Sequence, residues 1–371
     1  MSQTVLITGG AGFIGSHVAR HLLGRGYRVR VIDPLIPQVH EDRARPDYLE
    51  PDAELIVGDI RNRDCVDRAL DGVDKVIHFA ARVGVGQSMY EMAEYTSVNA
   101  LGTSVLLEAL MDRPVRKLLV ASSMSVYGEG LYVDAAGRSV AACERTRGQL
   151  ERGEWEPTGD DGERLEPAPT PESKLPSLSS IYALGKFDQE RMCLLFGSSY
   201  GVPTVALRFF NVYGPDQALS NPYTGVLAIF ASRLLNDRPP LIFEDGRQRR
   251  DFVHVRDVAE ACRLALTSRA ADGDVVNVGS GESASVLEIA ERLARVLDKE
   301  SVEPKVTGNY RVGDIRHCFA DVSRVRKTLG FEPRMSLEEG IEDLAGWLEG
   351  QVATDRVEDA ASELAQRGLT L

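Results

Sequence analysis

The segment Thr8-Gly9-Gly10-Ala11-Gly12-Phe13-Ile14-Gly15 follows a short apolar run, Val5–Ile7, and precedes apolar residues at helical spacing. In a strand–turn–helix unit the first glycine of such a triplet permits a tight turn, the second lets the backbone approach a pyrophosphate, and the third lets the helix pack on the strand. The helix N-terminus then faces the anion. The segment therefore predicts a dinucleotide-binding turn, with these cofactor contacts: Gly9, Gly12, Phe13, Ile14 and Gly15.

Six residues, which follow three later apolar runs, extend this predicted site. Asp33 ends the next apolar run, Val29–Ile32, at about the spacing expected of a carboxylate that binds the adenosine ribose. Its charge would repel a 2′-phosphate, so NAD is favoured over NADP. Two further runs end in residues that would meet the adenine ring or leave room for the dinucleotide: Asp59 and Ile60 after the third run, and Phe79, Ala80 and Ala81 after the fourth.

Short apolar runs alternate with helical segments up to Phe209. This alternation is typical of βαβ units, so we predict an α/β fold: a Rossmann doubly wound parallel sheet with a smaller C-terminal substrate-binding domain. We expect the NAD-binding domain over residues 1–210, with a return of the chain at about 250–275. The substrate-binding domain would span 211–350.

Two segments break the pattern. Residues 129–180 are rich in Gly, Pro, Glu and Arg, and are expected to form a surface insertion that is partly structured at best. It would act either as a lid or partner surface, or as an inert loop. Residues 351–371 are expected to form a charged, frayed tail.

Composition narrows the class of protein. The chain has 371 residues and a net charge of −13, which disfavours a nucleic-acid surface. We find no signal-peptide pattern at the start and no run of 18 apolar residues, so neither export nor a membrane span is expected. The five cysteines form no CxxC pair, which indicates reduced thiols in a cytoplasmic protein.

Tyr182 and Lys186 have the YxxxK spacing, which places both on one face of a helix. An ammonium beside a phenol would lower the phenol's pKa, and tyrosine could then act as acid or base near neutral pH. Ser123, just past a strand end, could hydrogen-bond the reacting oxygen. These three residues are the predicted catalytic group, and Tyr182 and Lys186 would also contact the cofactor.

Several motifs occur together in one order: the glycine turn, His78–Ala81, Ser122–Gly128, the YxxxK pair and Arg208–Pro215. In this the chain resembles the extended short-chain dehydrogenase/reductases of the NAD-dependent sugar epimerase/dehydratase family. The resemblance implies that Ser123, Tyr182 and Lys186 are catalytic and that the partner is a nucleotide-diphosphate sugar. It also implies a homodimer formed through helices near 95–111 and 182–200, and these substrate contacts: Ser88, Ser125, Asn211, Arg250 and Arg311.

The same resemblance bears on the reaction. Dehydratases and decarboxylases of this family carry a carboxylate just after the catalytic serine or threonine, whereas Met124 and Ser125 stand here. We therefore expect 4-epimerisation through a transient 4-keto sugar. A dehydratase or decarboxylase, a 4-keto sugar reductase and a non-catalytic dinucleotide sensor remain the alternatives.

Two segments, 218–225 and 239–246, look similar to bacterial dTDP-L-rhamnose 4-epimerases. Those relatives often carry CxxC pairs in the insertion, like a zinc ribbon. Only Cys143 lies in this insertion, so no metal is expected.

Overall fold

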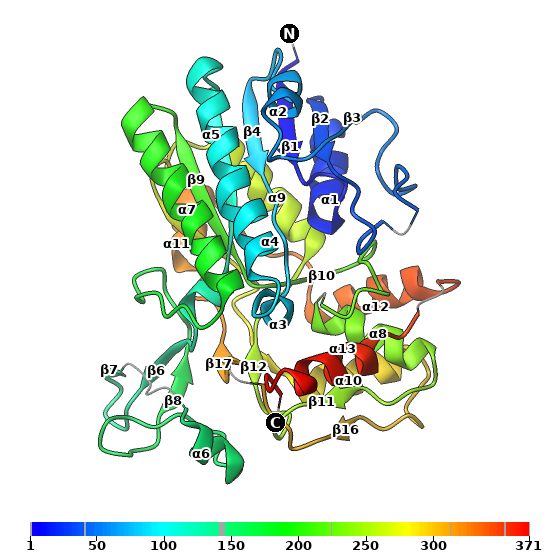
Figure 1. Ribbon diagram of the computed structural model, residues 1–371. Helices are drawn as coiled ribbons and strands as arrows, with labels where there is room; N and C mark the ends of the chain where they lie inside the picture. The colour runs from blue at the N-terminus through cyan, green and yellow to red at the C-terminus, as the bar shows by residue number, and fades with distance from the viewer. Residues whose placement is uncertain are drawn as a thin grey trace.

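The computed structural model describes residues 2–40, 42–140, 145–223, 225–311, 313–351 and 354–370. Its centre is a seven-stranded parallel sheet in the order β14-β9-β5-β4-β1-β2-β3 (Figure 1). The predicted Rossmann α/β fold is thereby confirmed. The strands are β1 (Thr4–Thr8), β2 (Arg28–Asp33), β3 (Glu54–Val57), β4 (Lys75–His78), β5 (Lys117–Ser123), β9 (Thr204–Phe209) and β14 (Val275–Val278).

Alternate residues of each strand face opposite helical layers, which is why nearly every strand position is apolar. In β1, Val5 and Ile7 pack into one core cluster and Leu6 into another. The first cluster is covered by α1 (Phe13–Leu23), α9 (Val255–Thr267) and α11 (Ser323–Leu329). The second is covered by α2 (Arg63–Ala69), α5 (Gly102–Asp112) and α7 (Ile181–Tyr200). A helical stretch made of α4 (Met92–Thr96) and the π-helical turn η1 (Ser97–Leu101) leads into α5.

Sheet order reverses between β1 and β4, and ligands of such sheets bind beyond the carboxyl ends of the strands at that point. After residue 250 the chain returns to the sheet domain with α9, adds β14 from Val275 to Val278, and contributes α11 later in the chain.

The C-terminal part has its own apolar cluster, which lies among three helices: α8 (Val226–Leu235), α10 (Val286–Val296) and α12 (Leu337–Leu348). It sits below the sheet in Figure 1. Its short pairings are β10 (Asn211–Tyr213) with β13 (Phe252–His254), β11 (Leu241–Ile242) with β16 (Lys305–Val306), and β12 (Arg249–Arg250) between β15 (Ala284–Ser285) and β17 (His317–Cys318).

The insertion is better ordered than the sequence suggested. Among its described residues, β6 (Leu131–Val133), β7 (Ser139–Val140) and β8 (Glu166–Ala168) form a three-stranded sheet. The short helix α6 (Arg147–Glu151) lies between β7 and β8 in the chain. Ion pairs hold it to the C-terminal part: the fully buried Arg316 binds the partly exposed Glu156 of the insertion at 2.5 Å, and the insertion's Arg145 binds the buried Glu244 at 2.7 Å. Ionic contacts therefore supply the order that the insertion's few apolar residues did not predict.

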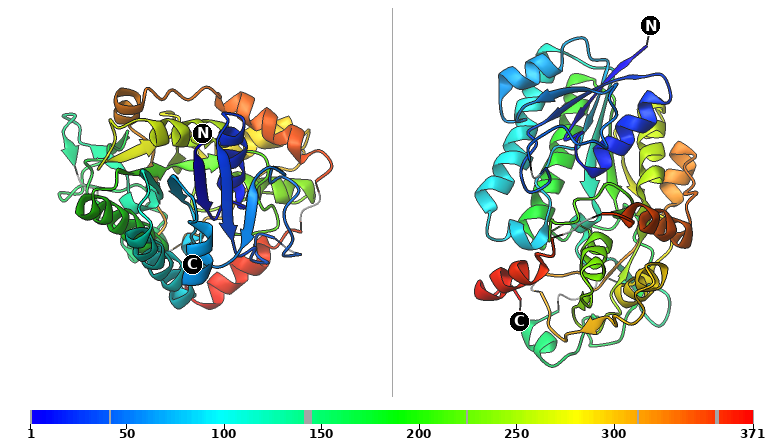
Figure 2. Two further views of the ribbon diagram at one scale, coloured as in Figure 1. Left: turned by 90° about the horizontal axis from the view of Figure 1, so that it is seen from above. Right: turned by 90° about the vertical axis from the view of Figure 1, so that its right-hand side faces the viewer.

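The expected frayed tail is also corrected. Residues 357–366 form α13 (Val357–Gln366), and its Ala360 and Leu364 are buried against the rest of the protein. Their spacing places them on one face of the helix. In the right-hand view of Figure 2, α13 lies beneath the short helices that lead into α5. No helix among the described residues has the length and apolar character needed to cross a membrane.

Candidate active site

A cavity of about 660 Å³ opens at the carboxyl ends of β1, β2, β4, β5 and β9, between the sheet and the C-terminal part. It is lined by every site residue predicted from the sequence except Ser88. Those residues are Gly9, Gly12, Phe13, Ile14, Gly15, Asp33, Asp59, Ile60, Phe79, Ala80, Ala81, Ser123, Ser125, Tyr182, Lys186, Asn211, Arg250 and Arg311.

Close approaches of the backbone require glycine at two positions of the turn. Gly9 has φ +67°, and a Cβ there would lie 2.9 Å from the backbone of Ala80. At Gly15 a Cβ would lie 2.5 Å from the Cα of Gly10, so only glycine lets α1 start where it does. Gly12 is different, because a Cβ there would meet only Gly9 O, at 3.4 Å. Its open side faces the cavity.

The start of α1 fits a dinucleotide pyrophosphate. Gly12 is the N-cap, no side chain caps the helix, and its first turn holds no acidic residue. The free N–H groups and the helix dipole at this end favour an anion. A glycine cradle beneath an uncapped helix end therefore suits NAD.

Asp33 lies at the end of β2 with its carboxylate fixed by two backbone donors, Leu35 N at 2.9 Å and Ala11 N at 3.2 Å. Burial raises the pKa of Asp33, and these hydrogen bonds together with His40 oppose the rise. Asp59 is held by Arg61, whose hydrogen bonds lower the pKa of that carboxyl. Ile60 supplies an apolar neighbour at the same wall.

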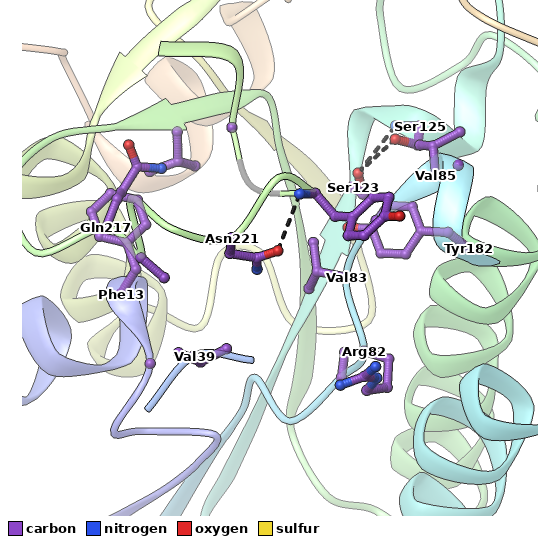
Figure 3. Close-up of a pocket in the computed structure, with 18 of the residues that line it drawn as sticks. Phe13, Val39, Arg82, Val83, Val85, Ser123, Ser125, Tyr182, Gln217 and Asn221 are labelled. Atoms are coloured by element: carbon purple, nitrogen blue, oxygen red, sulfur yellow. Dashed lines mark hydrogen bonds between the residues drawn. The ribbon is translucent and has the colours of Figure 1, made fainter. Parts of the chain in front are cut away.

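Ser123 ends β5, with Ser125 in the 3₁₀ turn η2 (Met124–Tyr127) that follows. Ser123 Oγ donates to Ser125 Oγ at 3.2 Å and accepts from Ser125 N at 3.2 Å. Figure 3 shows this pair beside the Tyr182 ring, which projects into the cavity from α7. The two serines and the phenol therefore share one corner of the cavity.

Lys186 does not lower the pKa of Tyr182 as the sequence argument expected. Burial raises the pKa of Tyr182, and a hydrogen bond with Ser123 opposes the rise. Burial also lowers the pKa of Lys186 to about 8. The Lys186 ammonium donates instead to Gln189 Oε1, at 2.7 Å. The YxxxK pattern placed both groups in the cavity, but their orientation follows from the surrounding contacts.

Ser88 has a different position from the one predicted. It is fully buried in the short helix α3 (Val85–Ser88), outside the cavity wall. Its Oγ accepts from Tyr182 N at 3.0 Å, while Ser180 Oγ accepts from Ala183 N at 3.1 Å. Both contacts satisfy free N–H groups in the first turn of α7. Ser88 thus fixes the start of the helix that carries Tyr182.

The residues predicted to hold a diphosphate, Asn211, Arg250 and Arg311, also line the cavity. Asn211 Oδ1 and Arg311 Nε are buried and have no hydrogen-bond partner among the described residues. The Arg311 guanidinium lies 4.2 Å from the Phe243 ring centre. Arg250 donates to Arg316 O at 3.0 Å and lies 3.7 Å from Asp314. Unpaired polar atoms on a cavity wall suit a polar ligand.

The structure adds wall residues that sequence reasoning missed. Among them are Arg82, Val83, Val85, Gln217, Asn221 and Tyr223, together with Val357, Ala360, Ala361, Leu364 and Leu369 from the C-terminal segment. The helical spacing of Val357, Ala360 and Leu364 could have indicated α13, whereas nothing in the local sequence placed it at the cavity.

No cluster of three or more potential metal ligands occurs among the described residues. Cys65, Cys193, Cys262 and Cys318 are free thiols. Cys143 lies outside the described residues.

The chain matches the model of the NAD dependent epimerase/dehydratase family over residues 5–147 and 155–279. It is 37% identical over 356 residues to a dTDP-L-rhamnose 4-epimerase of Burkholderia thailandensis, covering 93% of this chain and 95% of that protein.

Solved structures of nucleotide-sugar 4-epimerases are also similar to this chain. A UDP-glucose 4-epimerase of Thermotoga maritima with UDP-glucose superposes with a TM-score of 0.77 at 30% identity, covering 94% of this chain and 99% of that one. A UDP-glucuronic acid 4-epimerase of Bacillus cereus, in complex with UDP-glucuronic acid and NAD, gives 0.77 at 28% identity, with 94% and 99% covered. On the sequence match, the superposition and the cavity together, the chain belongs to the NAD dependent epimerase/dehydratase family.

Proposed function

We propose that this protein interconverts two nucleotide-diphosphate sugars that differ in configuration at C4. The observation that carries the proposal is the meeting of Tyr182, Ser123 and Lys186 with the glycine turn at one cavity. That arrangement joins a proton-transfer group to a dinucleotide site, and the wall of the same cavity holds unpaired polar atoms of Asn211 and Arg311 for an anionic substrate.

NAD is the cofactor of this family. The glycine turn and the start of α1 would hold its pyrophosphate, and Asp33 its adenosine ribose. Asp59 and Ile60 would adjoin the adenine, and Phe79, Ala80 and Ala81 the path of the dinucleotide. When bound, NAD would supply the reversible hydride acceptor that a change of configuration at C4 requires.

The protein's own residues move the proton. Tyr182 takes the proton of the C4 hydroxyl and later returns it, acting as base and then as acid. Ser123, which accepts from Ser125 N at 3.2 Å, would turn its one hydroxyl proton from Ser125 Oγ to the same sugar oxygen and keep that oxygen in line with the phenol. Lys186 would hold the nicotinamide ribose of NAD.

Epimerisation also requires the sugar to present its other face. Asn211, Arg250 and Arg311 would bind the diphosphate, which stays fixed while the 4-keto sugar turns about it. A guanidinium can bind phosphate oxygens through two parallel hydrogen bonds, which gives a firm pivot.

dTDP-L-rhamnose is the first substrate to test, because a relative that is 37% identical carries that activity in its name. Dehydration is disfavoured, since Met124 and Ser125 offer no carboxylate to remove a second proton.

The test is incubation of the purified protein with a panel of nucleotide sugars in deuterated and in ordinary water. A 4-epimerase converts one member without added cofactor and without solvent deuterium at carbon. Deuterium at C3 or C5 would indicate dehydration or another enolising reaction. A need for added reduced cofactor would indicate a reductase. Binding of NAD with every sugar left unchanged would indicate a sensor.

The homodimer expected from the family is part of this proposal. Apolar side chains are exposed along α4–α5 and α7, and two copies could bury them against each other. They include Met92, Leu101, Leu184, Leu195 and Tyr200. Light scattering of the holoenzyme tests this, and a monomer at micromolar concentration would contradict it. The buried free thiols Cys193, Cys262 and Cys318 favour a reducing, cytoplasmic location.

A further inference from the structure

The C-terminal segment, residues 354–370, forms part of the cavity wall and is attached at both ends. At its start, Asp355 pairs with Arg233 at 3.3 Å and with Arg238 at 3.0 Å. Arg233 and Asp355 are almost fully buried, so this end is firmly anchored. At its other end, Thr370 forms a backbone β-bridge with Arg311. The segment thus reaches an arginine that is proposed to hold the diphosphate.

Between these ends α13 turns an apolar face to the cavity. Leu364 is 5% exposed, and a Cβ placed on Gly86 would lie 3.2 Å from its Cδ2 atom. Gly86 belongs to α3, the same short helix whose Ser88 binds Tyr182 N. Leu364 therefore packs on the helix that fixes the catalytic end of α7, at the side of the cavity where the sugar must react.

Two hydrogen bonds and a cation–π contact connect α13 to the neighbouring loops. Tyr90 shares a hydrogen bond of 2.6 Å with Tyr223, which lines the cavity, and donates to Glu363 at 3.3 Å. The Arg367 guanidinium lies 4.3 Å from the Tyr90 ring centre. These contacts are more exposed than the Asp355 pair, so they are weaker.

Retention of the sugar matters for the proposed reaction. Once C4 has lost its hydride to the cofactor and its hydroxyl proton to Tyr182, the sugar is a ketone that must turn before the hydride returns. If it left at this stage, a bound NAD would keep the two electrons. The enzyme is then reduced and cannot start another cycle.

We propose that residues 354–370 form the wall that retains the 4-keto sugar, and that the Leu364 side chain contacts the sugar directly. This inference rests on the proposed function. An apolar wall suits the purpose because it limits escape without binding one orientation of the sugar through hydrogen bonds. The 4-keto sugar needs that freedom to rotate before the hydride returns.

The test compares four holoenzymes: wild type, a chain ending at residue 353, Leu364→Ala and the control Gln366→Ala. Gln366 is exposed on the same helix. Each is incubated with the sugar that the wild type epimerises. Three quantities are followed: product, reduced cofactor on the protein by its fluorescence, and free ketone trapped with hydroxylamine. Circular dichroism and NAD content confirm that each variant is folded.

We expect the shortened chain and Leu364→Ala to release at least about tenfold more ketone per turnover than wild type and to accumulate reduced cofactor, while Gln366→Ala behaves as wild type. If the shortened chain fails to fold, Leu364→Ala decides. Folded variants that turn over with no extra ketone release would overturn the retention role. If the wild type epimerises no sugar, the proposed function has failed instead, so the two failures are distinguishable.

Discussion

Lys186 and Gln189 are joined by a hydrogen bond of 2.7 Å between Nζ and Oε1, one turn apart on α7. Gln189 Nε2 in turn donates to Ala80 O at 3.0 Å and lies 3.1 Å from His78 Nε2. Burial, with a smaller contribution from Lys186, lowers the pKa of His78 to about 3, so His78 is neutral. Gln189 therefore links the lysine of the YxxxK pair to the strand end that borders the dinucleotide site.

Gln189→Glu tests this link. Burial lowers the pKa of Lys186 to about 8, and activity that needs its ammonium falls as pH rises through that value. A carboxylate at residue 189 stabilises the charged form and raises the Lys186 pKa. We expect the alkaline limb of kcat/KM to move to higher pH, measured as a pH profile. An alkaline limb at the wild-type pH would contradict the assignment of that limb to Lys186. Gln351→Glu, at an exposed position, is the control.

Tyr182→Phe removes the proposed base while keeping the ring that packs at the cavity wall. We expect turnover to fall roughly 100- to 10,000-fold, the usual contribution of a positioned acid–base group. Bound NAD, measured after denaturing the purified protein, stays at the wild-type level. Tyr200→Phe alters an exposed tyrosine of the same helix and serves as control. Retained turnover in Tyr182→Phe would exclude the phenol as the base.

Gly12→Ala separates cofactor binding from folding. Its Cβ meets the protein only at Gly9 O, at 3.4 Å, so the free energy of unfolding of the cofactor-free protein changes by about 0.5 kcal/mol or less. The same methyl occupies the side that a pyrophosphate would approach. We expect NAD affinity to fall at least about tenfold, measured by titration calorimetry. Gly24→Ala, at the other end of α1, has a similarly open Cβ position and should bind NAD normally.

Glu156→Gln tests the ionic attachment of the insertion. Burial alone would raise the pKa of Glu156, but hydrogen bonds from His317 and Arg316 lower it to about 2. Because the pKa of Glu156 is lower in the folded protein than its ordinary value of 4.5, the ionised carboxylate stabilises the fold at pH values above 4.5. This contribution is lost as the pH falls from about 4.5 towards 2.

We expect Glu156→Gln to lower the free energy of unfolding at pH 7 by about 1 kcal/mol, a value reduced for solvent screening of a partly exposed carboxylate. The difference from wild type should shrink in acid, as measured by urea denaturation at several pH values. Glu154→Gln removes an exposed partner of Arg152 and should have a smaller effect. A pH-independent difference would show that the pair does not carry the attachment.

The sequence by itself determined the parallel sheet, the dinucleotide turn and the residues gathered at its open edge. These depend on local rules: apolar runs make buried strands, glycine alone accepts the turn at residue 9, and a spacing of four puts Tyr182 and Lys186 on one helix face. The tertiary structure alone decided that Ser88 anchors α7 behind the cavity, that Arg316 and Glu156 order the insertion, and that Leu364 forms part of the cavity wall. Those outcomes depend on partners far away in the chain, whose distance and burial no local pattern encodes.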